Sequence, residues 1–176
     1  MTFLAAMHRR LPSTRLSALA RRLAVSGLLA ASIHAPAQTV LPAGRWQASM
    51  DAFAAADKLR QPQPDGVLFV GSSSIRFWAH MAQDFASRPV VINRGFGGST
   101  MADCHQLVRQ LVLQYRPRQV MVYAGDNDLA EGRTPAQVLE SFQGFVRAVR
   151  AELPEARIGY ISIKPSPARA ALLPQV

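Results

Sequence analysis

Three hydroxyl side chains follow a short apolar run in this chain. Residues 67–70 are four apolar residues, Gly71 interrupts the run, and Ser72, Ser73 and Ser74 come directly after it. Such a run is typical of a buried strand, which would place a serine at the carboxyl edge of a sheet and at the start of the next helix. Free N–H groups and a partial positive charge at a helix start suit an anionic ligand or a developing oxyanion. By itself, the pattern also fits a serine that only caps a helix.

Two further polar segments that contain glycine follow apolar runs. Residues 93–100, with glycines at 95, 97 and 98, follow residues 90–92, and residues 125–128 follow Gln119–Tyr123. Ester hydrolysis through a serine needs an attacking hydroxyl, a base, and hydrogen-bond donors aimed at the oxyanion. A serine, a glycine N–H and an asparagine amide from these three segments would supply the hydroxyl and the donors.

The residues between these segments predict strands that alternate with helices. Periodicity and capping patterns predict helices over residues 46–58, 75–85, 99–115 and 135–149, and strands over residues 67–70, 90–92, Gln119–Tyr123 and 157–163. This alternation predicts an α/β protein, a three-layer α/β/α sandwich with a parallel sheet. In such sheets, ligands bind beyond the carboxyl ends of the strands. The three polar segments are therefore expected at one edge of the sheet.

Taken together, the three segments resemble the first three sequence blocks of the SGNH hydrolases, the GDSL-type esterases and lipases. Gly71-Ser72-Ser73, residues 93–100 and residues 125–128 agree with these blocks in order, spacing and position at strand ends, and the resemblance covers residues 46–176. It implies a flavodoxin-like fold and a serine esterase that needs no cofactor. Since the sequence contains no Cys/His cluster with metal-ligand spacing, no metal site is expected. The implied substrates are carboxylic esters, such as acyl or acetyl esters of lipid or carbohydrate, which react through a seryl acyl-enzyme.

The resemblance also assigns residues to the site. Ser73 would be the nucleophile, and the Ser73 N–H, the Gly98 N–H and the Asn127 side chain would form the oxyanion hole. Ser72 stands where the family often has aspartate, which bears on substrate range more than on the chemistry. Lys164 and Ser166 follow the fourth predicted strand at the same edge, so they are candidates for substrate binding.

The family's fourth block, an Asp-x-x-His that supplies the base and the residue orienting it, has no counterpart in the sequence. His80 and His105 are interpreted as surface or helix-edge residues, Asp103 as a helix-start residue and Asp128 as a loop residue. A sheet ending at the fourth predicted strand would expose an apolar edge and face, and residues 170–173 look like the start of another helix. We therefore expect a C-terminally truncated form of a longer hydrolase that lacks the catalytic base and hydrolyses esters poorly or not at all.

The N-terminal residues 1–37 are predicted to be an export signal, followed by a partial esterase domain over residues 38–176. Arginines and no acidic residues precede an apolar run over residues 23–33, and Ala-Pro-Ala at 35–37 fits a cleavage site. The run is too short to span a membrane. The predicted location is therefore the periplasm or outside the cell.

Charge and motifs argue against other function classes. The net charge of +9 falls to +4 without residues 1–37, and no basic run with interleaved aromatic residues remains, so nucleic acid is not expected as a partner. The glycine segments contain neither Gly-Lys-Ser/Thr nor G-x-G-x-x-G, which disfavours a flavodoxin-like nucleotide-binding domain without excluding it. A non-catalytic module that binds an acylated glycan or lipid remains the main alternative.

Cys104 is the one cysteine, and it is predicted to be a buried apolar residue.

Overall fold

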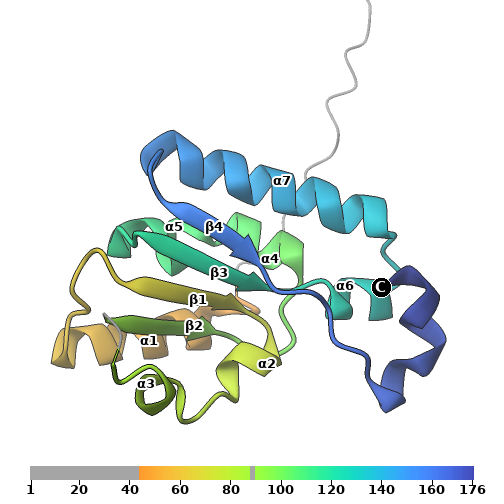
Figure 1. The fold of residues 1–176 in the computed structure, drawn as a ribbon, viewed down its shortest axis with the longest axis horizontal. Helices are drawn as coiled ribbons and strands as arrows, with labels where there is room; N and C mark the ends of the chain where they lie inside the picture. The colour runs from red at the N-terminus through yellow and green to blue at the C-terminus, as the bar shows by residue number, and fades with distance from the viewer. Residues whose placement is uncertain (1–43, 88–89) are drawn as a thin grey trace, which may run out of the picture. The chain divides into compact units, whose positions relative to one another are not determined.

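The computed structural model describes residues 44–87 and 90–176, and four parallel strands form a sheet in this part of the chain. The strands are β1 (Val67–Gly71), β2 (Val91–Gly95), β3 (Gln119–Tyr123) and β4 (Arg157–Tyr160). They lie in the order β2-β1-β3-β4, so that β1 and β3 are central (Figure 1). The predicted export signal over residues 1–37 lies outside the described residues.

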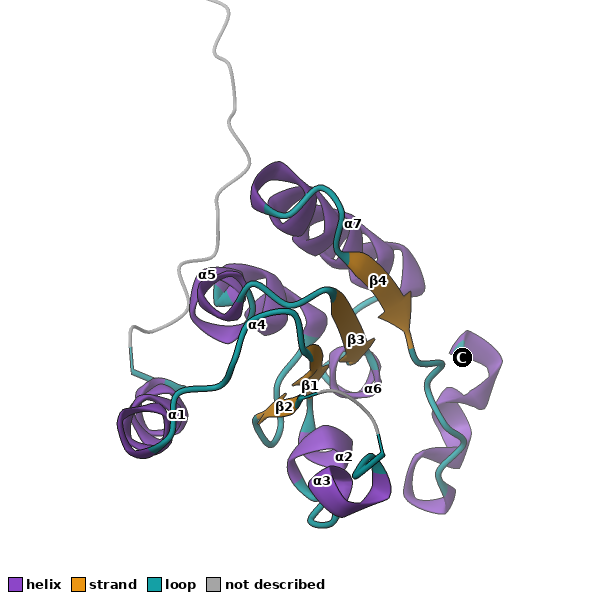
Figure 2. Ribbon diagram, turned by 60° about the vertical axis from the view of Figure 1, so that its left-hand side comes forward, coloured by secondary structure: helices purple, strands orange, loops and turns teal. Residues whose placement is uncertain are grey.

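Helices cover both faces of the sheet, which confirms the predicted α/β/α class (Figure 2). One face carries α1 (Gln47–Leu59), α4 (Met101–Gln106), α5 (Val108–Leu111) and α7 (Pro135–Glu152); the other carries α2 (Ser73–Arg76) and α3 (Met81–Asp84). Side chains alternate along β1, so Leu68 and Val70 join the first layer and Phe69 joins the second. No helix in the described ranges is long and apolar enough to cross a membrane.

The strand predictions are correct in position, but three of the four lengths are wrong. β3 has the predicted bounds, and β1 extends one residue further, to Gly71. β2 runs on to Gly95 because its polar residues pair in register with β1, with Asn93 opposite Phe69. β4 ends at Tyr160 rather than at residue 163, and after it a single further hydrogen bond joins the Ile161 N–H to the Val122 carbonyl.

Two of the predicted helices are broken into shorter pieces. Residues 75–85 contain the separate helices α2 and α3 rather than one helix. In the turn between them, the Trp78 ring packs against Phe69 of the sheet and against Phe85, with centroids 5.6 Å apart in both pairs. Phe77 is 72% exposed, so a continuous helix would not bury a continuous apolar stripe here.

The helix predicted over residues 99–115 is divided into α4, α5 and the 3₁₀ turn η1 (Leu113–Tyr115). Its apolar face is still largely buried, including Cys104, Leu111 and Tyr115. The segment ends where Arg116 takes a left-handed conformation before Pro117. Residues 170–173, which were expected to start a helix, lie inside the 3₁₀ segment η2 (Pro167–Gln175).

Candidate active site

The first loop begins at Gly71, where β1 approaches β3 very closely. Gly71 has a φ of +143°, and a Cβ at this position would lie 1.8 Å from the Tyr123 carbonyl oxygen. The same oxygen accepts a hydrogen bond of 2.9 Å from the N–H of Ser72, which is buried. This contact directs the chain into α2, whose first residue is the half-buried Ser73. No hydrogen bond from the Ser73 N–H to another described residue is found.

The second loop follows β2, and the end of this strand is held against α2. The Asn93 side chain donates to the Ile75 carbonyl and accepts from the Gly95 N–H, both at 2.8 Å. Gly98 has a φ of +81°, a conformation that side chains other than glycine rarely adopt. Within the described part of the chain, its N–H, like that of Ser73, donates no hydrogen bond.

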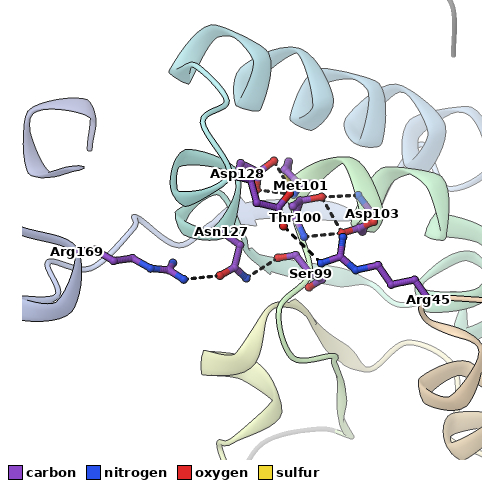
Figure 3. A network of polar contacts seen from close by, with 9 residues as sticks. Arg45, Ser99, Thr100, Met101, Asp103, Asn127, Asp128 and Arg169 are labelled. Atoms are coloured by element: carbon purple, nitrogen blue, oxygen red, sulfur yellow. Dashed lines mark hydrogen bonds and ion pairs between the residues drawn. The ribbon is translucent and has the colours of Figure 1, made fainter. Parts of the chain in front are cut away.

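The third loop follows β3 and leads into α6 (Asp126–Ala130), where Asn127 is 8% exposed. Its amide nitrogen donates a hydrogen bond of 2.9 Å to the carbonyl oxygen of Ser99, which belongs to the second loop (Figure 3). This contact ties the second and third loops together just past the ends of β2 and β3. The predicted meeting of the polar segments at one sheet edge is therefore observed.

Asp128 is not a loop residue, as the sequence interpretation had it. It lies in α6, is fully buried, and accepts hydrogen bonds from the Met101 N–H (Figure 3). Burial raises the pKa of its carboxyl group above the ordinary value. The interpretation of Asp103 as a helix-start residue is confirmed, because Asp103 and Thr100 form a capping box at the start of α4.

A polar pocket of about 240 Å³ opens beside the first loop. Ser73, Lys164 and Ser166, three of the predicted site residues, line it. The structure therefore brings the predicted nucleophile and the predicted substrate-binding residues into one pocket. The predicted oxyanion donors Gly98 and Asn127 are not among the residues that line it.

Two charged residues of this region carry no role in the sequence interpretation. The Arg169 guanidinium donates a hydrogen bond to the Asn127 side-chain oxygen and forms an ion pair with Asp126, and both charged residues line the same pocket as Ser73. Asp126 belongs to residues 125–128, which the sequence predicts as a polar segment of the site, but the sequence assigns Asp126 no role of its own. Arg169 follows no periodic pattern, so only the tertiary contact reveals it.

Neither histidine of the described residues lines this pocket. His80 is exposed and directly precedes α3. The imidazole ring of His105 packs against Gly144 of α7. The contact is so close that a Cβ on this glycine would lie 2.4 Å from the ring. Partial burial and the nearby positive charge of Arg147 lower the pKa of His105.

Cys104 is buried, as predicted, and burial raises the pKa of its thiol. A buried thiol of this kind is a packing residue rather than a nucleophile. In residues 44–87 and 90–176, no group of three or more His, Cys, Asp or Glu side chains is arranged to hold a metal ion.

Solved structures share this fold. A protein from Streptococcus pneumonia superposes with a TM-score of 0.61 at 18% identity, covering 69% of this chain and 56% of that one. A GDSL-like lipase from Bacteroides thetaiotaomicron superposes with a TM-score of 0.58 at 22% identity, covering 68% and 62%. AlinE4, an SGNH-hydrolase family esterase, gives a TM-score of 0.51 at 21% identity, covering 60% and 62%. The chain thus spans 56–62% of the length of these proteins.

No curated protein sequence matches the chain. The profile of the GDSL-like Lipase/Acylhydrolase family matches residues 64–175, which include all three loops and η2. The match covers more than half of the chain, and the α/β/α fold and the strand-end loops agree with it. The chain belongs to the GDSL-like lipase/acylhydrolase family.

Proposed function

We propose that the chain is a serine esterase domain in which Ser73 is the nucleophile. The observation that carries the proposal is the position of Ser73: its hydroxyl lies at the start of α2, on a polar pocket, and its own N–H has no partner among the described residues. An oxygen that attacks a carbonyl group next to a free N–H places the developing oxyanion close to a donor. The N-cap of α2 is Ser72 and Ser73 is the first helical residue, so Ser73 does not cap this helix.

The proposed reaction proceeds through an acyl-enzyme. The Ser73 oxygen attacks the ester carbonyl carbon and gives its proton to a base, and the tetrahedral intermediate then expels the alcohol, which takes up that proton. Water hydrolyses the acyl-enzyme and releases the acid. The Ser73 N–H, the Gly98 N–H and the Asn127 amide would donate to the oxyanion, and each donor contributes on the order of a hundredfold to a thousandfold in rate.

We propose that neither His80 nor His105 is the base. A base must come within hydrogen-bond reach of the nucleophile, directly or through one water. His80 is exposed, His105 packs on α7, and neither lines the pocket that contains Ser73.

The proposed substrates are small carboxylic esters, with acyl or acetyl esters of lipid or carbohydrate as the natural class. Lys164 and Ser166 line the pocket beside Ser73 and are proposed to contact the substrate. We also propose that residues 1–37 direct export, which is tested by the N-terminus of the mature protein: Gln38 is expected as its first residue.

The test is hydrolysis of p-nitrophenyl acetate by the 176-residue chain, by Ser73→Ala, and by the product of the complete reading frame if that extends past Val176. Activity that disappears in Ser73→Ala supports the proposal. Activity of the 176-residue chain that is also lost in His80→Ala or His105→Ala would overturn the exclusion of these histidines. Absence of activity in every form would favour the non-catalytic binding module instead.

A further inference from the structure

Arg169 reaches the third loop from a segment that is distant in sequence. Its Nη2 donates a hydrogen bond of 2.9 Å to the Asn127 Oδ1 (Figure 3). Its Nη1 lies 2.9 Å from the Asp126 Oδ2. The Arg169 side chain is 34% exposed and lines the same pocket as Ser73. The segment η2 therefore contributes a cation to the edge of the sheet where the three loops meet.

The Asn127 amide lies between a group that can only donate and a group that can only accept. A guanidinium carries five N–H donors and no acceptor, and a backbone carbonyl has no donor. The amide oxygen faces Arg169, and the amide nitrogen donates to the Ser99 carbonyl oxygen at 2.9 Å. The reversed amide would bring donor against donor at Arg169 and acceptor against acceptor at Ser99. Only one orientation of the amide satisfies both neighbours.

Arg169 is itself held at a second point. The carboxylate of Asp126 pairs with it, and the other oxygen of this carboxylate accepts a hydrogen bond of 3.5 Å from the Ser72 hydroxyl. Arg169 is thus held by Asn127 through one guanidinium nitrogen and by the ion pair with Asp126 through the other. A chain of polar contacts thus runs from the residue next to the proposed nucleophile, through Asp126 and Arg169, to Asn127.

We propose that Arg169 is a positioning residue that orients the Asn127 amide. In this orientation the amide nitrogen of Asn127 points toward the oxyanion as a donor, and the amide oxygen points away from it. This inference rests on the proposed function, because it assigns Arg169 a role through Asn127 in that reaction. Asn127 carries two N–H groups on this nitrogen. One binds the Ser99 carbonyl, and the other is left for the oxyanion.

The kinetic test compares the parent with Arg169→Ala, Arg169→Lys and the matched control Arg45→Ala. Arg45 pairs with Glu131 at the end of the same helix α6, but in an exposed ion pair of 3.4 Å. In Arg169→Ala, we expect kcat for p-nitrophenyl acetate to fall about tenfold with KM changed less than about twofold, because an oxyanion donor acts in the transition state. Arg169→Lys, which lacks the fork that spans two acceptors, is expected to be intermediate.

Chemical rescue separates orientation from a merely structural role. Guanidinium at millimolar concentration, far below denaturing levels, is expected to restore part of the kcat of Arg169→Ala and to leave Arg45→Ala unchanged. The comparison uses the form of the protein whose parent hydrolyses the ester, and equal kcat values for Arg169→Ala and Arg45→Ala in that form would overturn the inference. Arg169→Ala that unfolds at a much lower temperature than the parent and is not rescued by guanidinium would also overturn it.

A second readout needs no turnover. In the isotope-labelled chain, the NMR signals of the Asn127 side-chain amide are identified by their loss in Asn127→Asp. They are expected to shift and to exchange faster with water in Arg169→Ala, and to stay unchanged in Arg45→Ala. Unchanged Asn127 signals in Arg169→Ala overturn the inference whatever the activity. Full activity of Ser73→Ala would instead overturn the proposed function, while the amide signals would still test the contact.

Discussion

The buried carboxylate of Asp128 accepts two hydrogen bonds from one backbone group, the N–H of Met101, at 2.9 and 3.1 Å. Met101 is the first residue of α4, and its N–H is one of the groups that a helix start leaves without a partner inside the helix. Asp128 lies on α6, so this contact fastens the third loop to the helix that follows the second. The partial positive charge of the helix start favours the carboxylate there.

Asp128→Ala is expected to destabilise the protein by about 2 kcal/mol, because it leaves the buried Met101 N–H without an acceptor. Urea unfolding of the parent and the variant measures this difference. Glu131→Ala, which removes an exposed acidic side chain just after the same helix, is the control and should stay within about 0.5 kcal/mol of the parent. Equal midpoints for Asp128→Ala and Glu131→Ala would contradict the prediction.

The effect of Asp128→Asn is expected to depend on pH. Burial raises the pKa of Asp128 above its ordinary value of 3.8, although the Met101 N–H and the Arg133 charge act in the opposite direction. The folded state therefore holds this proton more tightly than the unfolded chain does, and the resulting stabilisation is complete below pH 3.8 and is lost as the pH rises through the folded pKa. Asparagine stays neutral throughout, so the melting temperature of Asp128→Asn relative to the parent should rise with pH in that window.

Thermal unfolding of both proteins between about pH 4 and pH 7 measures this difference. A difference in melting temperature that stays constant over the whole range would show that the folded and unfolded pKa values of Asp128 are the same.

Gly71→Ala is expected to destabilise the fold by more than about 3 kcal/mol, because steric overlap and backbone strain add together. The new Cβ would lie 1.8 Å from the Tyr123 carbonyl oxygen, and this oxygen cannot move without breaking the pairing of β1 with β3. Circular dichroism during urea unfolding measures the effect.

Gly132→Ala is the matched control for this substitution. Gly132 also has a positive φ, +83°, but no atom lies within 4 Å of the position that a Cβ would occupy there. Only the backbone strain remains at this residue, and we expect a loss of about 1 kcal/mol. Similar losses for the two variants would mean that the close approach of Gly71 to β3 contributes nothing.

Asp57→Ala is expected to destabilise the protein by about 3 kcal/mol, because it leaves the charge of Arg94 buried without its partner. The Asp57 carboxylate lies 2.5 Å from the Arg94 guanidinium, which is 8% exposed, and accepts a hydrogen bond of 2.5 Å from the Tyr115 hydroxyl. These contacts join α1 to β2 and η1. Calorimetric unfolding measures the loss, and Asp51→Ala, an exposed residue of the same helix, should have almost no effect.

Much of the architecture could be predicted from local sequence patterns. The run Gln119–Tyr123 is β3 with the same bounds, and a capping box of Thr134 and Gln137 starts α7 at residue 135, the predicted first residue of this helix. Such patterns report whether a residue is buried and how its nearest neighbours along the chain satisfy its hydrogen bonds. Both are decided within a few residues.

The failures have a common physical origin. The predicted helix over residues 75–85 is broken because the Trp78 ring packs on Phe69 of the sheet. The spacing of apolar residues within 75–85 gives no sign of this contact with another element. Asp128 was interpreted as a loop residue because its partner, Met101, lies 27 residues away. A buried aspartate and a loop aspartate look alike in sequence until the group that donates to the carboxylate is known.

By itself, the sequence determined the alternation of strands and helices and the three polar segments at strand ends, and its motifs pointed to the family. The tertiary structure decided which of these polar groups meet: Ser73 with Lys164 and Ser166 in one pocket, and Asn127 with Ser99 and with Arg169, 42 residues away. Apolar periodicity carries the first kind of information because burial repeats along an element. A polar contact is made once, between segments that only the folded chain brings together, so no local pattern records it.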